Sequence, residues 1–182
     1  MAMLDAEKAL PRAPPRGGFW RGAFSGAGIT GIAAAIGFLA VLPPSATSLV
    51  GAVTDARASA LMSGHAIEVA STDHHTVKPW FAGRIALSPP VADFAPQGFK
   101  LVGGRLAKVA GTQAAVVVYR HGQHEVELFV WPDRGASLPA TGQSHGVHSL
   151  FWRQGDLDLA AVSDTAPDEL AQFVALVKAQ RE

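Results

Sequence analysis

The chain carries no charged residue between Arg21 and Asp55, and this run constrains its folding more than any other feature. The most apolar part of the run, residues 22–42, is 21 residues long and is closed by Pro43 and Pro44. At about 1.5 Å of rise per residue, a helix of that length spans roughly 30 Å, the thickness of the hydrocarbon core of a bilayer. We therefore predict one membrane-spanning helix over residues 22–42.

The charges that flank this segment predict its orientation. Four basic residues precede it, the last being Arg21, whereas the first charges after it are Asp55 and Arg57. The positive-inside rule then places residues 1–21 in the cytoplasm as a short tail and the rest of the chain outside, in the periplasm of a Gram-negative bacterium. A cleaved signal peptide and a buried core helix are the alternatives, but the segment is longer than a signal-peptide core of about 7–15 residues.

The composition excludes several classes of partner and chemistry. Basic and acidic residues number 15 each, so no field of one sign attracts nucleic acid, and none is expected as a partner. The absence of cysteine excludes disulfides, thiolate nucleophiles and cysteine-ligated metal. Small residues four apart in the apolar segment, at Gly22/Gly26 and Ala27/Gly31, favour helix pairing and allow a homodimer.

After the two prolines the pattern is that of an α+β protein. Residues 45–63 have helical spacing and end at Gly64, which predicts a stalk helix next to the membrane. Residues 64–182 predict an extracytoplasmic domain with an antiparallel sheet of five or six strands, flanked by a short helix capped by Asp73 and a final amphipathic helix. The strands are expected within residues 65–71, 98–110, 113–121, 124–132 and 146–164.

Histidines are the obvious candidates for chemistry. Six of the seven occur as pairs: His74/His75, His121/His124 and His145/His148. Residues three apart on a strand point to opposite faces, so the last two pairs are expected to be solvated turn residues and not metal ligands. The sequence also lacks a nucleophile elbow, a phosphate-binding loop and a dinucleotide fingerprint. We therefore predict neither an enzyme nor a bound metal or cofactor.

The stretch HTVKPWFAGR is the strongest candidate for a functional surface. As a structural corner it would bury Trp80 and Phe81, and its cations would reach carboxylates such as Asp93. As a recognition surface it would offer an exposed tryptophan and arginine, which are frequent anchors of protein partners. The candidate residues of this recognition or structural corner are His75, Thr76, Lys78, Pro79, Trp80, Phe81 and Arg84.

Three stretches in order, HTVKPWFAGR, SPPVADF and QGFKLVGGRL, are followed by AAVVVYRHGQHEVELFVWP and AAVSD. From about Leu49 to Val177 this long pattern closely resembles the extracytoplasmic part of bacterial transmembrane anti-sigma factors, a class of transmembrane transcriptional regulators. The resemblance implies a single-pass inner-membrane regulator. In that family a cytoplasmic domain holds a sigma factor, and the outer domain senses or relays an envelope signal.

The sequence departs from this family at its N-terminus. The family's cytoplasmic domain is much longer and often has a His/Cys zinc motif, whereas residues 1–21 form a short tail without cysteine. We therefore expect the tail not to bind a sigma factor alone, and the protein partner to be a sigma factor or an envelope protein. The alternative function is a periplasmic binding module that is tethered to the membrane and has no role in sigma-factor control.

Overall fold

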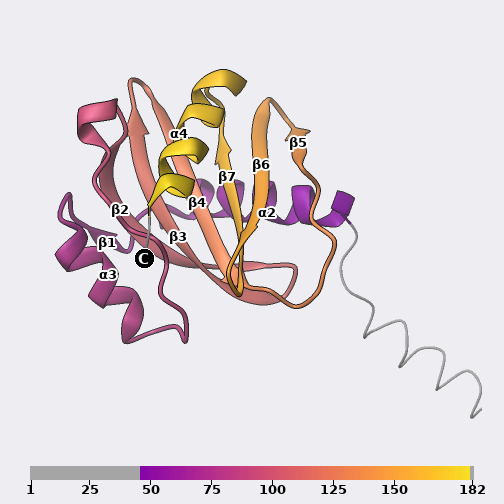
Figure 1. The fold of residues 1–182 in the computed structure, drawn as a ribbon, viewed down its shortest axis with the longest axis horizontal. Helices are drawn as coiled ribbons and strands as arrows, with labels where there is room; N and C mark the ends of the chain where they lie inside the picture. Colours follow the sequence, from indigo (N-terminus) through magenta and orange to yellow (C-terminus); the bar gives the residue numbers. More distant parts are fainter. Residues whose placement is uncertain (1–45, 181–182) are drawn as a thin grey trace, which may run out of the picture. The chain divides into compact units, whose positions relative to one another are not determined.

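The computed structural model describes residues 46–180, which fold into an α+β domain (Figure 1). The predicted cytoplasmic tail and membrane helix lie outside the described residues. Within residues 46–180, no helix is both long and apolar enough to cross a membrane.

One antiparallel sheet organises the domain, as predicted, but it has seven strands and not five or six. Its spatial order is β1-β2-β3-β4-β7-β6-β5. The strands are β1 (Val69–Ala70), β2 (Lys100–Val109), β3 (Thr112–His121), β4 (His124–Pro132), β5 (Thr141–Ser144), β6 (Val147–Gln154) and β7 (Leu157–Ser163). The strand that the sequence did not predict is β5, because its residues Thr-Gly-Gln-Ser are polar and show no alternating apolar pattern.

Three α-helices and one 3₁₀ turn surround the sheet. These are α2 (Ala46–Ser63), α3 (His74–Ala82), η1 (Ala95–Gln97) and α4 (Pro167–Ala179). Helix α2 runs behind the sheet in Figure 1, whereas α4 lies in front of it. Because Val77 and Phe81 of α3 belong to the same core cluster as Phe173 of α4, α3 and α4 cover the same face of the sheet.

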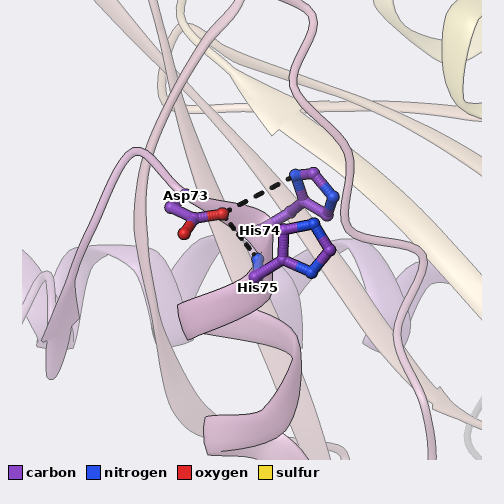
Figure 2. Close-up of side chains that lie close together, drawn as sticks. All are labelled: Asp73, His74 and His75. Atoms are coloured by element: carbon purple, nitrogen blue, oxygen red, sulfur yellow. Dashed lines mark hydrogen bonds and ion pairs between the residues drawn. The ribbon is translucent and has the colours of Figure 1, made fainter.

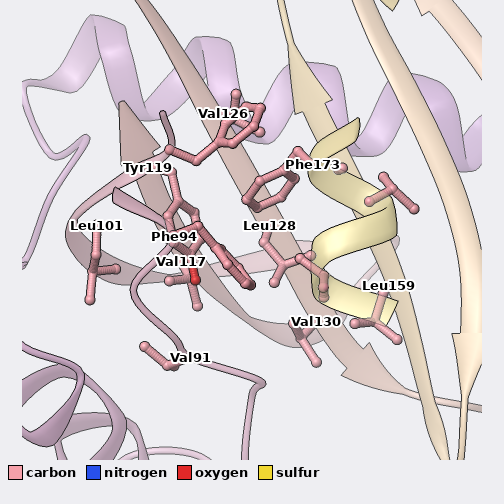
Figure 3. Close-up of a cluster of buried hydrophobic side chains, with 14 of the residues drawn as sticks. Val91, Phe94, Leu101, Val117, Tyr119, Val126, Leu128, Val130, Leu159 and Phe173 are labelled. Atoms are coloured by element: carbon pink, nitrogen blue, oxygen red, sulfur yellow. The ribbon is translucent and has the colours of Figure 1, made fainter. Parts of the chain in front are cut away.

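Both faces of the central strands are buried, since a core lies on each side of the sheet. In β3, Val117 and Tyr119 belong to the core under α3 and α4, while Val116 and Val118 belong to the core under α2. This explains why β3 and β4 are nearly continuous apolar runs. The core under α4 is centred on Phe173, whose ring centroid lies 4.9 Å from that of Tyr119 (Figure 3). The same ring lies 5.2 Å from that of Phe99, measured between centroids.

Helix α2 packs directly on the sheet. Leu49 and Val53, four residues apart on one helical face, are 2 % and 0 % exposed and lie in the core with Phe129. Gly64 follows the helix with a φ of +73°, in the left-handed region that commonly ends a helix. The structure has a helix at Ala46–Ser63, where a stalk was predicted over residues 45–63, but this helix packs as one layer of the domain instead of preceding it.

A β-bulge interrupts β2 at the glycine pair of LVGGRL. The pairing of β2 with β3 shifts by one residue between Leu101 and Gly103. A Cβ on Gly103 would collide with the carbonyl oxygen of Val69, and one on Gly104 would lie 2.6 Å from the ring of Phe81. The two glycines thus let the backbone of β1 and the side chain of α3 approach β2 closely.

Candidate functional site

The predicted corner is helix α3 and its C-terminal turn. Asp73 caps the helix, as predicted, because its Oδ1 accepts the backbone N–H of His75 at 2.8 Å. Pro79 lies inside the helix. Val77 and Phe81 are both fully buried, so they attach the inner face of α3 to the sheet.

The outer face of α3 is exposed to solvent. Phe81 is the only one of the seven predicted corner residues that is fully buried, and Trp80 is half-buried. The exposed members are His75, Thr76, Lys78, Pro79 and Arg84. The structure therefore brings the predicted residues onto one short helix and its C-terminal turn, where Phe81 is buried in the core, Trp80 packs partly against it, and the others form a surface.

Trp80 and Arg84 make a stacked pair on this surface. The guanidinium carbon of Arg84 lies 4.4 Å from the centroid of the Trp80 ring. The Arg84 Nη1 atom also donates a hydrogen bond to the Trp80 carbonyl oxygen at 3.1 Å. The predicted ion pair between Asp93 and Lys78 or Arg84 is absent from residues 46–180. Asp93 instead accepts the backbone N–H of Ala95 at 2.9 Å, at the start of η1.

A shallow cavity opens beside this surface. It has a volume of about 450 Å³ and lies where α3, the Pro89–Pro90 loop and the turn after β6 meet. Lys78, Pro89, Gln154 and Gln180 are among its lining residues. The Gln154 Oε1 atom is buried and has no hydrogen-bond partner among the described residues, so it remains available to a donor. The cavity adds polar groups to the exposed face of α3.

Buried ion pairs on the opposite face attach α2 to the sheet, and sequence reasoning missed them. Glu127 of β4 is fully buried between two arginines: its Oε2 lies 2.7 Å from Arg105 Nη2, and its Oε1 lies 3.3 Å from Arg57 Nη1. Arg57, in α2, also reaches Asp164 at 3.4 Å and the Glu125 carbonyl oxygen at 3.3 Å. The sequence signal for these ion pairs was a charged residue of opposite sign among the apolar residues of each strand, Arg105 in β2 and Glu127 in β4.

Arg105 borders a polar cavity of about 310 Å³ between α2 and the outer edge of β2. Ser59 and Ser63 of α2, together with Glu68 and Lys108, are among the other residues that line it. The Arg105 Nη1 atom is buried without a hydrogen-bond partner in the described part of the chain. A buried guanidinium nitrogen without a partner costs free energy in the folded state, so the polar groups at this contact between helix and sheet are only partly satisfied.

One histidine differs from its prediction as a solvated turn residue, and two others lie in a group of possible metal ligands. His121 is not a solvated turn residue, because its ring stacks on Phe99 at a centroid distance of 4.2 Å and its Nδ1 lies 2.9 Å from the Gly98 carbonyl oxygen. The only group of three metal-ligating side chains within residues 46–180 is Asp73, His74 and His75 (Figure 2). Neither of the pairs spaced three apart belongs to such a group.

The pKa values of Tyr119 and Glu169 are shifted, and each shift has a structural cause. Burial raises the pKa of Tyr119, whose hydroxyl lies in the apolar core, so this residue stays protonated. The Thr165 hydroxyl, which donates to Glu169, lowers the pKa of that carboxyl, and nearby His121 adds to the effect. Both groups act in holding α4 and the sheet together.

Comparison of the chain with protein-family models gave no match, and comparison with curated proteins gave none either. The relation to anti-sigma factors therefore stays a prediction from the sequence.

Proposed function

We propose that this protein is a single-pass regulator of the bacterial inner membrane, of the anti-sigma factor type. In this proposal residues 22–42 span the membrane with the N-terminus in the cytoplasm, and the α+β domain lies in the periplasm. The domain relays an envelope signal through protein–protein contacts, not through catalysis. Its cytoplasmic effect requires a sigma factor or a separate protein that binds one.

The observation that carries the proposal is the attachment of α2 to the sheet. Helix α2 begins at Ala46, shortly after the apolar segment in the sequence, and its inner face is held by Leu49 and Val53. Arg57 adds ion pairs with Glu127 in β4 and with Asp164, the residue that follows β7. A change in the sheet therefore reaches α2 directly, as a relay to the membrane requires.

The exposed face of α3 supplies a surface for the partner. Trp80 and Arg84 form a stacked pair of the residue types that anchor protein interfaces, and Lys78 adds a second cation. Because the two cations have no ion-pair partner among the described residues, we expect a partner segment that carries carboxylates. Helix α3 is separated from α2 by the whole sheet, so partner contact and relay use different faces.

Co-purification tests the proposal. The full-length tagged protein would be cross-linked in its native membrane and purified, and its partners would be identified by mass spectrometry. We expect a sigma factor, or a separate cytoplasmic protein that binds one, together with an envelope protein. Recovery of envelope proteins alone would overturn sigma-factor control and favour the tethered binding module.

A charge-reversed variant sharpens this experiment. Lys78→Glu combined with Arg84→Glu is expected to lose the envelope partner and to keep the cytoplasmic one. Arg134→Glu, which reverses an exposed charge in the loop between β4 and β5, is the matched control and is expected to keep both. Equal recovery from all three proteins would exclude the face of α3 as the contact.

A further inference from the structure

The start of α3 brings together three side chains of the types that bind transition metals. Asp73, His74 and His75 each offer a ligand atom, and these atoms all lie within 4.8 Å of one another. The His74 and His75 rings lie with their centroids 4.1 Å apart, and the Asp73 carboxylate points toward them in Figure 2. This cluster is not one of the two pairs spaced three residues apart.

We propose that Asp73, His74 and His75 form a binding site for a divalent transition-metal ion of the Zn²⁺ or Cu²⁺ class. Two imidazoles and one carboxylate are a ligand set that suits both ions, with water in the remaining position. The inference goes beyond the proposed function and does not depend on it.

The distances require only a small rearrangement. A tetrahedral ion with ligands at about 2.0–2.1 Å holds neighbouring ligand atoms roughly 3.4 Å apart. Asp73 Oδ1 and His74 Nδ1 are already 3.9 Å apart. The side chain of His74 is 44 % exposed, so rotation about its own bonds can bring its ligand atom closer to the Asp73 carboxylate without moving the core.

Asp73 can cap the helix and bind an ion at the same time. Its hydrogen bond to the His75 backbone uses Oδ1. No hydrogen bond to Oδ2 occurs among the described residues, and a carboxylate has lone pairs for both tasks. The cap also fixes the carboxylate beside the two rings, so part of the site is ordered before an ion arrives.

The position of the site at a helix N-terminus limits its affinity. The end of α3 carries a partial positive charge that repels a cation, and the Asp73 carboxylate opposes this effect. The ligands are also exposed, so water competes for the ion. We therefore expect reversible binding of one ion in the micromolar range and not a permanent structural metal.

Calorimetric titration of the full-length protein with zinc chloride and with copper sulfate tests the site. The protein would be purified without a histidine tag and kept in neutral detergent. We expect one ion per chain, with His74→Ala and His75→Ala each weakening binding at least tenfold. Asp73→Ser is expected to weaken binding as well, although serine still caps the helix, because the carboxylate is lost.

Matched controls are the exposed histidines outside the cluster. His65→Ala and His145→Ala are expected to change the affinity by less than twofold. The electron paramagnetic resonance spectrum of the Cu²⁺ complex should show two coupled nitrogens in the parent protein. It should show one coupled nitrogen in His74→Ala and one in His75→Ala. Absence of binding would overturn the proposal, and so would equal weakening by the control variants or retention of both nitrogens after His74→Ala.

Discussion

The ring of Phe81 in α3 rests on the backbone of Gly104 in β2. A Cβ at position 104 would lie only 2.6 Å from the Phe81 Cζ atom, far inside the contact distance of two carbon atoms. The contact joins two segments that the sequence resemblance contains as separate stretches, HTVKPWFAGR and QGFKLVGGRL. The absence of a side chain at Gly104 therefore helps to set the position of α3 on the sheet.

Replacement of Gly104 by alanine should loosen α3. The new methyl group forces the buried Phe81 ring to move, and overpacking of this kind costs about 1–3 kcal/mol. Urea unfolding monitored by circular dichroism would measure the loss. Gly83→Ala, at the residue that caps the end of α3, is the control, because an added Cβ there meets no atom within 4 Å and the backbone φ is −84°. Equal stability of the two variants would contradict the packing described here.

Removal of Glu127 should destabilise the domain much more than removal of its neighbour Glu125. Glu127→Ala leaves the buried guanidinium of Arg105 without a carboxylate and removes one of the two carboxylates that Arg57 contacts, which costs about 3–5 kcal/mol. Glu125 pairs with Arg120 near the surface, at 3.5 Å, and such pairs contribute only about 0–1 kcal/mol. Urea unfolding of both alanine variants makes the comparison. Similar losses would show that the buried pairs do not hold α2 in place.

The two faces of α3 should respond differently to truncation. Phe81→Ala removes a fully buried ring and is expected to cost about 3–5 kcal/mol of unfolding free energy. Lys78→Ala, on the exposed face, should stay within about 0.5 kcal/mol of the parent protein. Thermal unfolding measures both effects. A large loss for Lys78→Ala would mean that this side chain serves the fold and not a partner surface.

Acid should release the start of α4. The pKa of Glu169 is lowered in the folded protein, first by the Thr165 hydroxyl and then by His121, so the ionised carboxylate favours folding. This contribution is fully present above the ordinary pKa of a glutamate and is lost as the pH falls through the lower value of the folded state. Glu169→Gln should therefore have a flatter acid limb of stability against pH. Parallel curves for the two proteins, from thermal unfolding between pH 3 and 7, would refute this.

Much of the fold could be predicted because its signals are local. The β3–β4 hairpin follows from two runs rich in β-branched and aromatic residues on either side of the Gly122–Gln123 turn, and the structure pairs His121 with His124 at its end. The cap of α3 by Asp73 is equally local. The polar residues of β5 give no such signal, since that strand is defined by its backbone pairing with β6.

The candidate sites were harder to predict, because their parts meet through register and side-chain rotation. Arg105 belongs to β2 and Glu127 to β4, and β3 lies between these strands. Only the pairing of the three strands brings Arg105 Nη2 to 2.7 Å from Glu127 Oε2. The approach of His74 and His75 depends on rotamers that the sequence does not encode. The residues of the corner at α3 were predicted from the sequence. Which of them are buried and which face solvent could be told only from the structure.

The margins of the sheet bear on how crowded copies of this protein would behave. One outer strand, β1, has two residues, and the other, β5, has four, none of them with an apolar side chain. Beyond β1, the Leu106 N–H is taken by the Glu68 carboxylate at 3.1 Å, and exposed Lys108 follows on the same strand. Such blunt, charged margins give a second chain little backbone to add to, so neighbouring domains can be concentrated without joining into fibrils.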